Sequence, residues 1–282
     1  GGTGTGDTIT LTAATQQTAV FGASFTGFET IGVTAATSQH LTVTMGNSLS
    51  SGDVITLDAA VLTSTLADVV FDGSAQVSGT GAFNINGGSG NDTIKGGMGT
   101  DTLDGGLKGL DVFYSYKGND IIDFGEGTGS NTDTWYMSGA ANSSTNVDTI
   151  SNFTQGSSND ILDLTALATF EKGTTEQLHV LTTFTDAGAS NDNILVLNTG
   201  HYHANAAALL SNMGEGDTTI GSDVAASAVH VAVAYQASSG GNIRIASATL
   251  ANAGGFTAVT DLAILSGVTD MTGFHSTNFV VD

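Results

Sequence analysis

The chain has 282 residues and a formal net charge of −22, because Asp and Glu total 27 whereas Lys and Arg total 5. This charge argues against nucleic acid and anionic lipid as partners, since both are bound through clustered basic side chains. Hydrophobic residues make up 40% of the chain, which indicates a folded protein rather than a disordered one. No apolar run reaches the roughly 18 residues of a membrane-spanning helix.

The chain has no cysteine and no proline but 39 glycines. Without cysteine it has no disulfides, no thiolate metal sites and no thiol nucleophile. Glycine is used nearly twice as often as its average of about 7%, which predicts many tight turns. We therefore expect short strands joined by glycine turns.

Residues 1–86 are rich in Thr, Ala and Gly, with short β-type runs at 8–11, 41–44 and 54–57. Alternation of β-branched and small residues predicts a stack of strands with irregular turns. We expect a β-solenoid-like domain over 1–86. The chain shows no basic segment followed by an apolar stretch at its start, so no secretory signal peptide is visible.

Tandem nonapeptides follow this domain. Residues 87–95 and 96–104 both match the pattern G-G-x-G-x-D-x-U-x, where U is a large apolar residue. Residues 105–113 keep the pattern with one inserted residue, and 118–122 retain a shortened copy.

Each position of the repeat suggests a task. The paired glycines allow the chain to reverse sharply and to direct carbonyl oxygens inward, and the Asp adds a carboxylate to the turn. Oxygen-only ligands suit Ca²⁺ at roughly 2.3–2.6 Å, whereas Mg²⁺ needs a tighter octahedron and Zn²⁺ needs His or Cys. The U side chains are expected to point into a core: Ile94, Leu103, Phe113 and Ile122.

The repeat length also predicts which turns meet. Nine residues give one turn and one strand, so two repeats complete a coil. Asp92 should then stack near Asp111, and Asp101 near Asp120, each 19 residues apart. Such carboxylates repel one another without a cation, so metal binding should contribute directly to folding.

The repeats resemble those of the RTX (repeats-in-toxin) family of calcium-binding β-roll proteins over about 87–123. The resemblance implies a parallel β-roll, Ca²⁺ between its coils and type I secretion by an uncleaved C-terminal signal. In the family, each site takes a carboxylate and two glycine carbonyls from each of two stacked turns. The implied ligands here are Gly88, Gly90, Asp92, Gly97, Gly99, Asp101, Gly106, Gly109, Asp111 and, by its carboxylate alone, Asp120.

Residues 148–153 and 160–164 resemble the D-x-I-x-D-F…D-x-I-D-L segment that follows such repeats, with Asn152 in place of an Asp. This likeness adds three implied metal ligands: Asp148, Asp160 and Asp163. By contrast, we expect Asp123 and Asp133 to be solvated.

The pattern changes near residue 194. Residues 194–197 read as a buried strand, and 204–213 as a short helix that Gly214 ends. Residues 229–235 and 243–245 predict the two strands of a hairpin.

The expected fold is thus mainly β: a parallel β-roll or β-solenoid with calcium between its coils, and a smaller C-terminal mixed α/β domain. The expected divisions are 1–86, an RTX β-roll at 87–193 and a capping domain at 194–282. The ending at 278–282, apolar and then acidic, resembles RTX C-termini, so the capping domain should contain the secretion signal.

Catalytic signatures are missing, because the sequence contains neither H-E-x-x-H nor G-x-S-x-G. We therefore expect that the chain is not an enzyme. We expect instead a secreted calcium-binding structural protein of the bacterial cell surface, such as a surface-layer or matrix subunit. Its expected partners are copies of itself in a lattice or fibre, and cell-surface polysaccharide.

Two alternative functions remain open. One is the export and folding module of a larger RTX toxin, adhesin or hydrolase; the other is a carbohydrate-binding adhesin with exposed aromatic rings near Trp135, Tyr136 or Tyr202.

Overall fold

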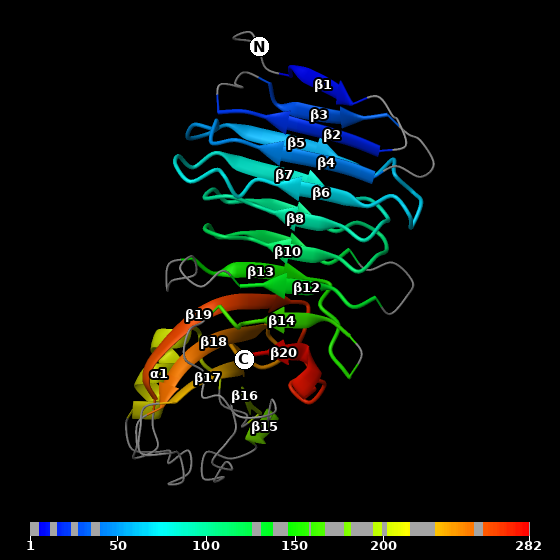
Figure 1. Cartoon of the computed structure of the whole chain (residues 1–282). Coiled ribbons are helices and arrows are strands. Elements are labelled where there is room, and N and C mark those ends of the chain that lie inside the picture. The colour runs from blue at the N-terminus through cyan, green and yellow to red at the C-terminus, as the bar shows by residue number, and fades with distance from the viewer. Residues whose placement is uncertain are drawn as a thin grey trace.

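The computed structural model describes residues 6–11, 16–23, 28–34, 40–125, 131–137, 146–157, 159–166, 178–181, 194–198, 202–214, 229–250 and 256–281. In these residues the first half of the chain winds into a roll whose strands stack along one axis (Figure 1). Successive strands alternate between two facing sheets, so every two strands complete one coil.

One sheet of the roll contains β1 (Thr8–Leu11), β3 (Thr30–Val33), β5 (Val54–Asp58), β7 (Ala82–Asn86), β9 (Thr102–Asp104), β11 (Ile121–Asp123) and β13 (Asp148–Ser151). The facing sheet contains β2 (Gln16–Phe21), β4 (His40–Met45), β6 (Val69–Asp72), β8 (Thr93–Lys95), β10 (Val112–Tyr114), β12 (Thr134–Tyr136) and β14 (Ile161–Asp163). Each strand pairs in parallel with the strand two positions later, as β8 does with β10 and β9 with β11. The predicted β-roll is confirmed.

The core lies between the two sheets and is built from the middle residue of each short strand. Ile94 and Phe113 lie side by side on β8 and β10, and Leu103 and Ile122 on β9 and β11. All four are fully buried, as the repeat predicted. Burying one such side chain contributes about 1.5–3 kcal/mol, so a three-residue strand is stable only within the stack.

The C-terminal part extends one sheet of the roll. Strand β19 (Phe256–Ser266) pairs in parallel with β13 and antiparallel with β18 (Ile243–Leu250). Beyond β18 the sheet continues through β17 (Val229–Gln236), β16 (Ile194–Leu197) and β15 (Leu178–Leu181). The predicted strand at 194–197 and the predicted antiparallel hairpin are both confirmed.

A helix and a final strand complete this part. Helix α1 (Ala206–Gly214) occupies the predicted helical segment and is held at its start by buried Asp261, which accepts a hydrogen bond from the Ala206 N–H (3.0 Å). The short helix η1 (Ser276–Asn278) leads into β20 (Phe279–Val280), which pairs with β14 in the other sheet. No helix in the described segments has the length and apolar character needed to cross a bilayer.

Candidate metal sites in the stacked glycine turns

At one edge of the roll, the turn 87–92 stacks on the turn 105–111 of the next coil. The N–H of Asp92 donates a 2.8 Å hydrogen bond to Oδ1 of Asp111. The repeat length predicted this contact between residues 19 apart, and it is confirmed.

The same contact recurs along this edge and forms the first aspartate ladder, which comprises Asp92, Asp111, Asp133 and Asp160. The ladder begins where the Val69 N–H donates to Asp92 Oδ1 (2.6 Å). It continues from the Asp111 N–H to Asp133 Oδ1 (2.6 Å), and from the Asp133 N–H to Asp160 Oδ1 (2.9 Å). Each carboxylate is thereby fixed by the backbone of the preceding coil.

The opposite edge carries the second aspartate ladder, which comprises Asp101, Asp120 and Asp148. Phe83 N–H donates to Asp101 Oδ1 (2.8 Å), and Asp101 N–H donates to Asp120 Oδ1 (2.8 Å), which confirms the second predicted pair. Asp120 N–H then donates to Asp148 Oδ1 (3.0 Å). Asp148 Oδ2 also accepts from the buried Ser115 hydroxyl (2.7 Å).

All seven ladder carboxylates are buried. Loss of solvation raises the pKa of Asp92 and Asp101 to about 7. The pKa of Asp111 and of Asp120 is raised to about 9, mainly by burial and in addition by the charges of neighbouring ladder aspartates. Hydrogen bonds from backbone N–H groups oppose these shifts only in part. Without a cation, therefore, ionised ladders are unfavourable at neutral pH.

Two ladder oxygens in the described residues are buried without any hydrogen-bond partner: Oδ2 of Asp92 and Oδ2 of Asp120. One such oxygen lies in each ladder. A buried acceptor that no donor satisfies costs about 1–3 kcal/mol, and more when it is charged. A cation coordinated at these oxygens would remove that cost.

In three ladder residues the second carboxylate oxygen, Oδ2, lies over the first glycine of its own turn; in Asp101 this oxygen also accepts a hydrogen bond from Gly97 N–H (2.7 Å). A Cβ atom added to Gly87 would lie 2.2 Å from Asp92 Oδ2, and one added to Gly96 would lie 2.4 Å from Asp101 Oδ2. Gly105 has the same relation to Asp111, at 2.3 Å. The first glycine of the repeat therefore leaves space for a carboxylate inside the turn.

The later glycines allow adjacent coils to approach closely. Gly109 has φ of 126°, which L-residues rarely adopt, and an added Cβ would lie 1.9 Å from the carbonyl oxygen of Gly90. The Cβ position of Gly106 lies 2.0 Å from the carbonyl oxygen of Gly88. Backbone carbonyls of one turn thus lie directly against the glycines of the next.

The glycines implied as carbonyl ligands lie in these stacked turns: Gly88, Gly90, Gly97, Gly99, Gly106 and Gly109. Two of their carbonyls already accept hydrogen bonds from the next coil: Gly88 from Leu107 N–H (2.8 Å) and Gly97 from Lys117 N–H (3.1 Å). A carbonyl oxygen has two lone pairs, so each retains one for a metal ion. Coordination by these carbonyls remains a prediction.

The donor set fits calcium. The ladder turns offer carboxylate and carbonyl oxygens, and Ca²⁺ takes six to eight oxygen ligands in flexible geometry. Among the residues that the structure describes, no three His, Asp or Glu side chains gather closely enough to hold a metal ion by themselves. Carbonyls would therefore have to complete each coordination shell.

Comparison with known families bears directly on this assignment. The family model of the RTX calcium-binding nonapeptide repeat (4 copies) matches residues 79–107 and 106–130. The chain therefore contains RTX calcium-binding nonapeptide repeats over these residues. These repeats, of which the chain has several copies, bind Ca²⁺ ions. Searches of the curated proteins and of the solved structures each gave no match.

Both ladders continue past the matched RTX repeats. Asp148 and Asp160, which sequence resemblance implied as ligands, lie in the second and first ladder respectively. Asp163 lies in neither. Its Oδ1 accepts from the N–H and hydroxyl of Thr165 (3.0 and 2.6 Å), so in the described structure it caps the turn after β14.

The expectation that Asp133 is solvated is wrong, because this residue is buried within the first ladder. The signal was present in the sequence: Asp133 precedes Thr134 and Trp135 as Asp92 precedes Thr93 and Ile94. Spacing concealed it, since Asp133 follows Asp111 by 22 residues rather than 19.

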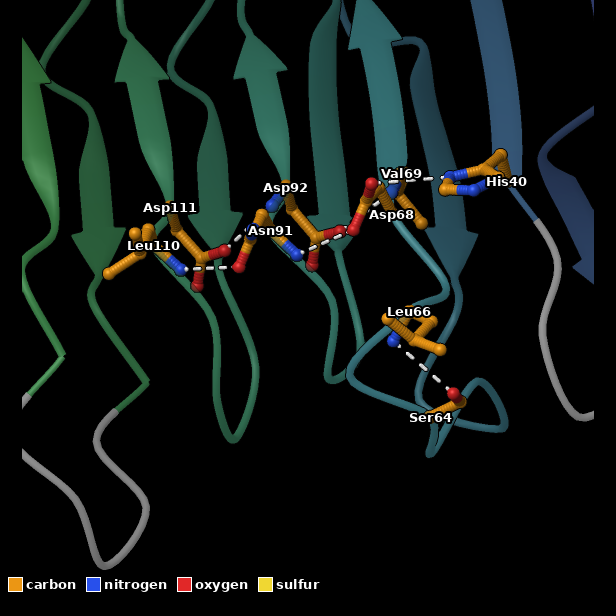
Figure 2. A network of polar contacts seen from close by, with 9 residues as sticks. All are labelled: His40, Ser64, Leu66, Asp68, Val69, Asn91, Asp92, Leu110 and Asp111. Atoms are coloured by element: carbon orange, nitrogen blue, oxygen red, sulfur yellow. Dashed lines mark hydrogen bonds and ion pairs between the residues drawn. The ribbon is translucent and has the colours of Figure 1, made fainter.

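Sequence reasoning also missed an outer ladder beside the first one (Figure 2). Asn91 N–H donates to Asp68 Oδ1 (2.9 Å), and Leu110 N–H donates to Asn91 Oδ1 (3.0 Å). His40 Nδ1 lies 3.2 Å from Asp68 Oδ2 at the end of this row. The Asn-Asp dipeptide of the repeat therefore has two tasks: Asn91 joins coils on the outside, and Asp92 joins them inside.

Proposed function

We propose that the protein is a secreted structural component of the bacterial cell surface, a surface-layer or extracellular matrix subunit, that folds and assembles when it binds calcium. The observation that carries this proposal is the extent of the two aspartate ladders. They join the turns of consecutive coils from β6 to β14, so calcium would act on the body of the molecule rather than on a peripheral loop.

The ladders suit a protein that is exported before it folds. With little calcium, the buried carboxylates oppose compaction; with the higher calcium outside a cell, binding to the folded state stabilises it. This supports type I secretion and an extracellular location for the protein.

We further propose that the chain is not an enzyme. Its single arginine, Arg244, is engaged by Asp261 through a 3.1 Å ion pair that fixes the C-terminal sheet, so it is not free to clamp an anionic substrate. Of the three aromatic residues considered for carbohydrate binding, Trp135 is buried and the Tyr136 ring stacks on Tyr114 (4.7 Å between centroids). Tyr202 is exposed (43%), so this alternative has the support of one ring only.

The experiment is to measure the mass of the full chain by sedimentation with chelator, with calcium and with magnesium at equal ionic strength, and to image each sample by electron microscopy. We expect an extended monomer in chelator and in magnesium, and regular assemblies in calcium. A compact monomer in calcium would refute assembly while leaving calcium-dependent folding intact.

A further inference from the structure

A buried side-chain amide joins two turns just before the second ladder. Gln76, in the turn between β6 and β7, accepts hydrogen bonds at Oε1 from the N–H groups of Ser48 (3.1 Å) and Leu49 (3.0 Å). Its Nε2 donates to the carbonyl oxygens of Leu49 (2.9 Å) and Ser78. All hydrogen-bonding positions of the amide are thereby used, within one turn and across to the turn one coil earlier.

Gln76 borders the calcium-binding turns directly. A Cβ added to Gly97, in the first turn of the second ladder, would lie 3.0 Å from Gln76 Cβ. On the outer side of the same pair of turns, Asn47 Oδ1 accepts from the N–H groups of Val77 and Ser78 (3.2 Å each). These cross-links between the turns are made by neutral amides.

A second buried side-chain amide, that of Asn278, lies beside the C-terminal end of the first ladder. Asn278 is fully buried, and its Oδ1 accepts from the N–H groups of Gly156 (3.0 Å) and His275 (2.9 Å). Its Nδ2 donates to the carbonyl oxygens of Gly156 (3.1 Å) and Asp160 (2.8 Å). Asn278 therefore satisfies the backbone next to the last aspartate of the ladder.

We propose that Gln76 and Asn278 are amide clamps that take the place of a metal ion between stacked turns, so that the calcium-dependent coils lie between two pairs of turns whose cohesion needs no metal. An amide supplies both donors and acceptors and carries no charge that must be neutralised. The clamped turns thus keep their stacking when the ladder turns separate. They give the ladder turns fixed ends on which to re-form when calcium returns.

Hydrogen exchange of the full-length chain tests this directly. In chelator at neutral pH, the amides of Ser48, Leu49, Gly156 and His275 should stay protected, because they donate to the clamps. The amides of Asp92, Asp101 and Asp111 should lose protection, because they donate to ladder carboxylates. In calcium both sets should be protected. Simultaneous loss of both sets in chelator would overturn the proposal.

A substitution separates the clamp from general stability. Gln76→Glu replaces the Nε2 donor by an oxygen that faces the carbonyls of Leu49 and Ser78. In chelator this should reduce protection at Ser48 and Leu49 by about tenfold or more, since an unsatisfied buried group costs about 1–3 kcal/mol. The matched control is Gln16→Glu, which adds the same charge at an exposed position of β2 and should change nothing.

Asn278→Asp provides the equivalent test at the other end, with Asn84→Asp on the exposed face of β7 as its control. Protection should fall at Gly156 and His275 in the first variant only. Unchanged protection in Gln76→Glu and in Asn278→Asp would show that the amides do not hold these turns. The wild-type exchange pattern decides the question even where a variant fails to fold.

Discussion

Asp92 donates its backbone N–H to the carboxylate of Asp111 across 2.8 Å, and both residues are buried. One carboxylate oxygen is therefore fixed by the preceding coil, while the other lies over a glycine of its own turn. This arrangement recurs in turn after turn, so metal binding, protonation and stacking act on the same carboxylates.

The pH dependence of the metal-free protein should be opposite to that of most proteins. Burial raises the pKa of five ladder carboxylates, those of Asp92, Asp101, Asp111, Asp120 and Asp160, to between about 6 and about 9 from their ordinary value of 3.8. The folded state then binds more protons, so its stability is greatest below the unfolded pKa and is lost as the pH rises through the folded values.

In chelator, we expect the melting temperature from circular dichroism to rise as the pH falls from about 8 to about 5. With saturating calcium the trend should reverse, because protons displace the metal. A chelated protein whose melting temperature is constant over this range would contradict the assignment of raised pKa values to the ladders.

Asp111→Asn should separate the two effects of a ladder carboxylate. The amide oxygen can still accept from Asp92 N–H, but the buried charge is gone. We expect the chelated protein to gain about 1.4 kcal/mol or more at neutral pH, the equivalent of one pKa unit, and the calcium concentration for half-maximal folding to increase. Urea unfolding and calcium titration measure the two quantities. Asp58→Asn, which removes an exposed carboxylate at the end of β5, should change neither.

Gly109→Ala should disrupt coil stacking in the presence of calcium. The new Cβ would lie 1.9 Å from Gly90 O, and φ at this position is 126°. Gly52→Ala is the control, since φ there is 91°, also outside the left-handed helical region, and no atom lies within 4 Å of the new Cβ. We expect Gly109→Ala to lose about 1–3 kcal/mol more unfolding free energy than Gly52→Ala. Equal losses would mean that strain in φ, rather than contact between coils, governs the site.

Leu103→Ala should remove about 2–5 kcal/mol of unfolding free energy in calcium, because the side chain is fully buried between the sheets. Leu110→Ala, at a residue that is 54% exposed, should stay within about 0.5 kcal/mol of the wild type. If the two substitutions had similar effects on thermal or urea unfolding, Leu103 would not be a core residue between the sheets.

The core and the stacking of the aspartates could be predicted from the sequence where the nine-residue period is intact. Core residues such as Ile94 and Leu103, and the stacking of Asp92 on Asp111, follow from period and alternation alone. Asp133 was missed because a longer turn breaks the spacing while the stacking of coils persists. The amide of Gln76 was missed because its partners, Ser48 and Leu49, lie in a turn that has no repeat.

The C-terminal pairing was beyond prediction for a different reason. Parallel pairing of β13 with β19, and of β14 with β20, joins segments separated by most of the C-terminal part. Such contacts follow from the closure of long loops and leave no local signal in composition or spacing. The antiparallel hairpin of β17 and β18, by contrast, has short-range signals and was predicted.

The return of β19 and β20 to the roll has a consequence for incomplete chains. Gly156 and Asn278 bond across 122 residues, so a product truncated before the final strands would leave β13 and β14 as bare edges with unpaired backbone groups. Exposed edges of this kind recruit strands from other molecules and lead to aggregation. Translation errors that shorten the chain would thus yield insoluble material, whatever the calcium supply.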